Sequence, residues 1–169
     1  MTDKGIQIVP LREESLAAPS RQFFLALMRW RPEWRQHCRM QESDNGTESD
    51  LVVEIPSPTG DSGRNINVWV SNGDLSLSFG PWHTHGQLIL ELCDGHYEEV
   101  GLLDAIRMIV ENQLVCFHEE LESGLGGGLL DLRKPDAILE EITDKYSTGR
   151  ISVRSWDGQA DQNVDVTSD

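Results

Sequence analysis

The chain has 169 residues and a formal net charge of −15, from 14 Lys and Arg against 29 Asp and Glu. This length suits a single domain with one hydrophobic core. The charge argues against nucleic acid and against an anionic membrane surface as partners, because both are bound mainly through Lys and Arg. No run of 18 apolar residues is present, so the sequence predicts no membrane span.

The N-terminus lacks the basic and apolar regions of a signal peptide. The three cysteines, Cys38, Cys93 and Cys116, are odd in number and widely spaced, which does not fit a disulfide framework. We therefore expect a cytoplasmic protein with reduced thiols.

Residues 1–19 are expected to be extended, and residues 20–41 to form an amphipathic helical segment. Apolar residues recur on one face of that segment at helical spacing: Phe23, Leu27, Trp30 and Trp34. Pro32 predicts a kink, or a break at which a second short helix opens. Residues 1–42 carry seven Lys and Arg against five Asp and Glu, whereas the rest carry seven against twenty-four. We expect the mildly basic helix to pack on an acidic body.

Residues 42–50 are polar and acidic and predict a solvated loop. A short strand at 51–55 ends at Pro56. Residues 66–79 alternate between apolar and polar on either side of Asn72-Gly73, a turn sequence that favours hairpins. The sequence therefore predicts a β-hairpin over 66–79.

The second half is expected to hold, in order, a helix at 97–113, a β segment at 114–117, a glycine loop at 124–128, a strand at 129–132, a helix at 135–146, a strand at 151–156 and an acidic, disordered tail at 157–169. The element order is α-βββ-α-ββ-α-β. It predicts one α+β domain over 20–156, with a mainly antiparallel sheet of about six strands and two to three helices packed on it.

The most unusual string is Phe79-Gly80-Pro81-Trp82-His83-Thr84-His85-Gly86. In an extended segment, His83 and His85 point the same way, so both imidazoles could reach one zinc ion, with His96 as a third ligand. The string matches no established metal motif. The alternative is a rigid strand exit in which Trp82 packs and the histidines bond to nearby backbone or carboxylates.

Other catalytic patterns are weaker. There is no Gly-x-Ser-x-Gly nucleophile motif, and the glycine run from Gly124 to Gly128 lacks the lysine of a phosphate-binding loop. Cys93 and Cys116 are each near a histidine in sequence, but a catalytic pair requires nearness in space. No cofactor is expected apart from the candidate zinc ion.

Five of the aromatic residues are tryptophans. If Trp82 and Trp156 are exposed beside acidic residues, they suit a protein interface, and the net charge would steer a basic partner towards it. The aromatic face of residues 20–41 could instead contribute to a homo-oligomer.

The string Ser78–His85 after the hairpin, together with segments 129–137 and 146–156, resembles a group of small bacterial α+β proteins of unassigned function. Some of them are described as immunity proteins of toxin systems. The resemblance covers about residues 50–157, leaves out the helix at 20–42 and carries no catalytic residue. It implies a bacterial cytosolic protein that is non-enzymatic or of unassigned function.

We therefore expect an acidic, immunity-like interaction module that binds a basic protein, with Trp82, His83, His85 and Trp156 near the contact. The alternative is a metal-binding protein, or a metal-dependent hydrolase, that uses His83 and His85 with His96 or an acid.

Overall fold

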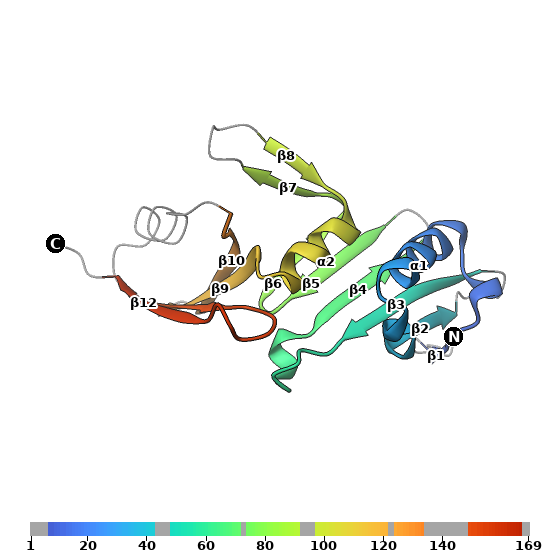
Figure 1. The fold of residues 1–169 in the computed structure, drawn as a ribbon, viewed down its shortest axis with the longest axis horizontal. Helices are drawn as coiled ribbons and strands as arrows, with labels where there is room; N and C mark the ends of the chain where they lie inside the picture. The colour runs from blue at the N-terminus through green and yellow to red at the C-terminus, as the bar shows by residue number, and fades with distance from the viewer. Residues whose placement is uncertain are drawn as a thin grey trace, which may run out of the picture.

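A computed structural model of the chain describes residues 7–42, 48–71, 74–91, 97–121, 124–133 and 149–166. These residues form an α+β fold of three antiparallel sheets with two α-helices (Figure 1). The predicted class, with a six-stranded antiparallel sheet, is confirmed. Within the described part of the chain, no helix is long and apolar enough to cross a membrane.

The largest sheet is a six-stranded meander in which each strand pairs with its neighbour in the chain. Its strands are β1 (Ile8–Pro10), β2 (Cys38–Glu42), β3 (Ser49–Ile55), β4 (Ile66–Val70), β5 (Leu75–Phe79) and β6 (Trp82–His85). Alternation places Leu51 and Val53 on a fully buried inner face, while Asn67 and Trp69 lie on an outer face that is open to solvent. The strands of the hairpin predicted at 66–79 are confirmed in β4 and β5.

Helices α1 (Ala18–Trp30) and α2 (Leu102–Val110) supply the helical layer of the main core (Figure 1). Phe24 and Leu27 of α1 and Ile106 of α2 are fully buried there. At the start of α1, the buried Ser20 hydroxyl donates a hydrogen bond of 2.6 Å to the carbonyl of Val70. Part of the apolar face of α1 is thus used within the chain, while Phe23 and Trp30 are only partly buried.

A second sheet has the order β10-β9-β11-β12, with a small core of its own. Its strands are β9 (Leu114–Leu121), β10 (Gly124–Asp131), β11 (Gly149–Arg154) and β12 (Gln162–Val166). The third sheet is a two-stranded ribbon of β7 (Leu88–Glu91) and β8 (Tyr97–Val100), which stands out from the body beside α2 (Figure 1).

The N-terminal predictions were only partly right. Residues 1–19 include β1, a 3₁₀ turn η1 (Glu13–Ser15) and the start of α1, and Pro32 opens a 3₁₀ helix η2 (Pro32–His37). Residues 38–42 form β2 instead of continuing the helix, because Cys38 and Met40 are buried and alternate with solvent-facing neighbours. Both ends of the loop predicted at 42–50 likewise belong to β2 and β3.

The helix predicted at 97–113 is wrong in its first residues, which form β8, and Gly101 caps the shorter α2. The predicted glycine loop is the first part of β10. Its glycines permit close strand packing, since a Cβ atom on Gly127 would lie 2.7 Å from the carbonyl oxygen of Phe117. Glycine-rich composition therefore indicated a loop where the chain needs small residues in a strand.

The tail predicted as disordered contains β12, which pairs with β11. The turn before β12 is held in place by Asp161, whose carboxylate accepts hydrogen bonds of 2.9 Å from the backbone N–H of Ser155 and from Arg64. The helix predicted at 135–146 and the turn Asn72-Gly73 lie outside the described residues.

Candidate functional site

The string Phe79–His85 is a tight hairpin between β5 and β6. Phe79 pairs with Trp82, so Gly80 and Pro81 form a two-residue turn. Gly80 has a φ of +58°, a conformation that glycine adopts without strain. Glycine followed by a residue with negative φ is the arrangement of a type II′ turn, which suits the proline. The unusual string thus has a structural explanation in its first half.

His83 and His85 lie side by side on the exposed face of β6, as their spacing predicts. Their ring centroids are 5.8 Å apart, and the ring planes are nearly perpendicular. The Nδ1 atom of His85 is 3.8 Å from a carboxylate oxygen of Asp74, and both side chains are more than half exposed. The pair faces solvent, not a cavity that excludes water.

A structural zinc site has four protein ligands, and a catalytic zinc site has three protein ligands and a water molecule. Among the residues that the structure describes, no group of three or more His, Cys, Asp and Glu side chains is arranged to hold a metal ion. His96, the predicted third ligand, lies outside those residues. The described geometry therefore offers two imidazoles that could occupy two positions around an ion, with water in the others.

Trp82 and Trp156 do not lie with the histidines. Trp82 alternates with His83 along β6 and points to the inner face, where it packs against the main core. Trp156 packs against the same core, with its ring centroid 6.4 Å from that of Trp34. Of the four residues predicted to share one contact surface, the two histidines face solvent and the two tryptophans pack against the main core.

Trp30 and Trp34 form an edge-to-face pair with centroids 5.3 Å apart. Two guanidinium groups cover Trp30: the carbon of Arg31 is 5.2 Å from the ring centroid and that of Arg107 is 5.1 Å from it. These contacts join the C-terminal part of α1 to α2 and stabilise the ring by cation–π attraction. The arginine-rich helix is therefore used partly for internal packing.

The β7–β8 ribbon exposes apolar side chains that the sequence analysis did not single out. Ile89 is 64% exposed and Tyr97 is 71% exposed, the largest values among the large apolar side chains described. The register Ile89↔Glu99 and Glu91↔Tyr97 places these residues on one face of the ribbon. A signal was available in the apolar segment 88–92 and the short segment 97–100, which begins with tyrosine and ends with valine, on either side of a polar stretch that contains Asp94-Gly95.

The other face of the ribbon is anchored in the body. Leu88, Leu90 and Val100 are buried in the main core. Beyond them, Arg133 donates a hydrogen bond of 3.1 Å to Glu98 of β8 while it contacts both carboxylate oxygens of the buried Asp131. These charge-assisted bonds raise the pKa of Arg133, the bond to Asp131 most. The ribbon is held to β10, so its exposed face has a defined orientation.

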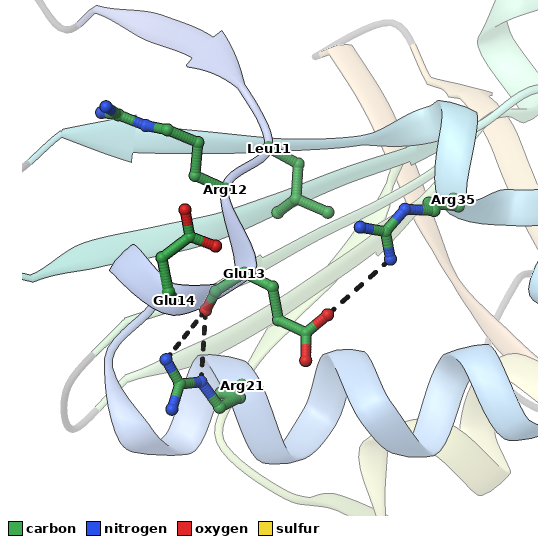
Figure 2. A pocket seen from close by; sticks show the side chains of 6 residues that line it. All are labelled: Leu11, Arg12, Glu13, Glu14, Arg21 and Arg35. Carbon is green, nitrogen blue, oxygen red and sulfur yellow. Dashed lines mark hydrogen bonds and ion pairs between the residues drawn. The ribbon is translucent and has the colours of Figure 1, made fainter.

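A hollow of about 470 Å³ lies beside the start of α1 (Figure 2). Arg21 donates hydrogen bonds of 3.1 and 3.2 Å to the backbone carbonyl of Glu13, and Arg35 lies 3.8 Å from the Glu13 carboxylate. Arg12 pairs with Glu42 at 2.9 Å. The arginines of the hollow thus bind groups of the chain itself, and the contacts of Arg21 and Arg35 hold the N-terminal segment against α1 and η2.

The described cysteines are unsuited to nucleophilic catalysis. Cys38 and Cys116 are buried, and burial raises the pKa of each thiol to about 11. The thiol form, not the reactive thiolate, therefore prevails at neutral pH. Cys93 lies outside the described residues.

Comparison with protein-family models, with curated proteins and with solved structures finds no match. The features of the chain that bear on function are the exposed face of the β7–β8 ribbon and the imidazole pair of β6.

Proposed function

We propose that this chain is a non-enzymatic interaction module that binds a basic protein through the outer face of the β7–β8 ribbon. The observation that carries the proposal is the exposure of Tyr97 and Ile89 on one face of a projecting ribbon. Exposed tyrosines are common anchors of protein interfaces, because one rigid ring offers both apolar area and a hydroxyl group. Single exposed apolar residues are ordinary, but two together on an anchored element favour a docking role.

Charge indicates what kind of partner the ribbon would bind. Residues 88–100 include Glu91, Asp94, Glu98 and Glu99 and no Lys or Arg. A basic surface would be steered towards this acidic segment and would gain from Glu99, which lies beside Ile89 on the outer face, whereas Glu98 is already paired with Arg133. A second copy of the chain carries the same acids and would be repelled, so a basic partner is favoured over a homo-oligomer.

The backbone of the ribbon supports the same proposal. In the described part of the chain, β7 and β8 pair only with each other. Each strand therefore has an outer edge whose backbone groups can accept a further strand. Apolar contact with Ile89 and Tyr97 would add specificity to that backbone pairing. An immunity-like role, in which an acidic chain blocks a basic toxin, fits this proposal and is supported by the resemblance noted above.

The test compares the full-length chain with the double variant Ile89→Lys/Tyr97→Lys. The control is Ile8→Lys, which places one lysine at an isoleucine that is 57% exposed on β1. Each immobilised protein is incubated with lysate at low salt, and retained proteins are identified by mass spectrometry. A photo-cross-linking residue at position 97 or at position 8 then shows which face the partner touches.

We expect at least one basic protein to be retained by the wild type and by Ile8→Lys, lost by the double variant, released by added salt, and cross-linked from position 97 but not from position 8. Retention by the double variant, or cross-linking only from position 8, would contradict the proposal. Circular dichroism checks that the double variant is folded.

The imidazole pair supports a second candidate function, the binding of a transition-metal ion by His83 and His85. Their side-by-side placement on β6 is the specific observation in its favour. Metal-dependent hydrolysis would need further ligands and a bound water, and the described residues contribute no third ligand. Elemental analysis of tag-free protein tests this candidate, since one equivalent of metal would support it.

A further inference from the structure

One face of the four-stranded sheet gathers cationic and hydrogen-bonding side chains in an otherwise acidic chain. The register aligns His118 of β9 with Ser152 of β11, and Ser152 with Asn163 of β12. Arg150 and Arg154 lie two residues on either side of Ser152, so all three share a face of β11. These five residues line a hollow of about 200 Å³.

The hollow has an excess of positive charge. Its lining includes two arginines and a histidine and no carboxylate. Asp165 pairs with Arg150 in register and shares its face of the sheet, although it does not line the hollow. The Oδ1–Nε distance is 4.0 Å and both side chains are more than two-thirds exposed, so this ion pair is weak. Among the described residues, no carboxylate lies within ion-pair distance of Arg154.

The side chains are oriented by contacts with one another. The Asn163 side-chain oxygen accepts a hydrogen bond of 3.0 Å from the Ser152 hydroxyl and contacts of 3.4 Å from the Arg154 guanidinium. Arg154 also donates to the backbone carbonyl of Val153 at 3.0 Å. Because its side-chain oxygen is used in this way, Asn163 has its side-chain N–H groups left as donors. The guanidinium of Arg154 likewise keeps N–H groups that these hydrogen bonds do not use.

We propose that this hollow is a binding site for a phosphate group of the monoester type. Two guanidinium groups can neutralise a dianion and offer paired N–H donors that match its oxygens. His118 and Asn163 approach from the two neighbouring strands, so donors surround the site from three sides, which suits a tetrahedral anion better than a planar carboxylate. Gly127, which pairs with His118, adds no side chain on the β10 side.

The net charge of −15 does not prevent this binding. At physiological salt, the field of exposed charges falls off over about 8 Å, so the nearest groups decide the local potential. Acids farther away than this contribute little to the potential in the hollow, whereas Asp165, 4.0 Å from Arg150, offsets part of the charge of that arginine. The site is independent of the proposed protein contact, which lies on the β7–β8 ribbon.

The test titrates full-length, ¹⁵N-labelled protein with inorganic phosphate at constant ionic strength and follows amide and arginine Nε–H signals by NMR. We expect saturable shifts centred on residues 118, 150–154 and 163. Arg150→Gln and Arg154→Gln should each weaken binding about tenfold, because a hydrogen-bonded charge is lost. The matched control is Arg12→Gln, in the hollow of Figure 2, and should leave binding unchanged.

Two further titrations identify the source of the phosphate. A phosphoserine peptide that binds more tightly than inorganic phosphate would indicate a modified protein as ligand, whereas a sugar phosphate or nucleoside monophosphate that does so would indicate a metabolite. Shifts that are not saturable, shifts that persist in both arginine variants, or equal weakening by Arg12→Gln would overturn the proposal. Since Arg150 is 68% exposed, its variant is expected to fold and keeps the test decisive.

Discussion

Gly80 and Cys116 lie in such close contact that a Cβ atom on residue 80 would be 2.7 Å from the Cys116 sulfur. The contact joins the β5–β6 turn to β9 and so connects the two larger sheets. Two requirements meet at this glycine, a positive φ and the absence of a side chain. The turn of the Phe79–His85 string thus holds one sheet against the other.

Gly80→Ala is therefore expected to lower the free energy of unfolding by about 3 kcal/mol, from left-handed backbone strain and from the clash with sulfur. Gly86→Ala separates the two causes, because Gly86 has a φ of +80° and nothing within 4 Å of the added Cβ. That variant should lose about 1 kcal/mol. Urea unfolding measures both, and equal losses would show that the contact with Cys116 costs nothing.

Arg133→Ala should loosen the β7–β8 ribbon, because Arg133 links Glu98 to the buried Asp131. The Arg133 side chain is 36% exposed, so solvent weakens its ion pairs. We expect the substitution to lower the free energy of unfolding by about 2 kcal/mol. Glu98→Gln removes only the outer contact and should cost under about 1 kcal/mol. Hydrogen exchange in β8 should accelerate more in Arg133→Ala, and the reverse order would refute the assigned role.

Stability should fall in alkaline solution because of the two buried thiols. Burial raises the pKa of Cys38 and of Cys116 from 9.0 to about 11, so the folded state holds these protons more tightly than the unfolded state does. The contribution is fully present below about pH 9 and is lost as the pH rises towards about 11. Urea unfolding across this range should show a smaller decline for Cys38→Ala/Cys116→Ala than for the wild type.

Asp161 should make the turn before β12 sensitive to acid. Desolvation raises its pKa, but the hydrogen bonds from Arg64 and from the Ser155 N–H outweigh that effect, and the net pKa is lowered. Its stabilisation is present above the unfolded pKa of 3.8 and is lost as the pH falls below it. Asp161→Asn should cost about 2 kcal/mol at neutral pH. Asp165→Asn, at a side chain that is 81% exposed, is the control and should change stability little.

Zinc added to metal-free protein should shift the imidazole NMR signals of His83 and His85 together, because their rings are neighbours. Binding should be weak, since two imidazoles supply only part of a zinc coordination shell. His83→Gln and His85→Gln should each abolish the shared response, and His37→Gln should retain it. A response confined to one histidine would exclude a joint site.

The β-hairpin over residues 66–79 was predictable because alternation with period two and a turn signal agreed. The same alternation predicts that Trp82 and His83 point to different faces, provided that the segment beyond the turn is recognised as a strand. An interpretation of the segment as a strand exit instead groups Trp82 with the histidines, although its side chain faces away from them. Local spacing fixes which residues share a face only when the boundaries of the strand are known.

The ribbon and the phosphate hollow were harder to foresee. The exposure of Tyr97 depends on β8 ending at Val100, before Gly101, whereas helical periodicity further on favoured one long helix. The hollow depends on the pairing of β9 with β11 and of β11 with β12, which brings His118 beside Ser152 and Asn163. Such register across distant segments is set by tertiary packing and has no short motif.

The two larger sheets differ in where along the chain their strands lie. Each strand from β1 to β6 pairs with the next, so a nascent chain that has emerged as far as His85 already contains every strand of the six-stranded sheet. The four-stranded sheet instead pairs β9 with β11 and is complete only when β12, close to the last residue, has been made. Synthesis from the N-terminus therefore makes every strand of the six-stranded sheet available before β9, β11 and β12. The hollow of the four-stranded sheet, which needs β9, β11 and β12 together, then forms after the six-stranded sheet.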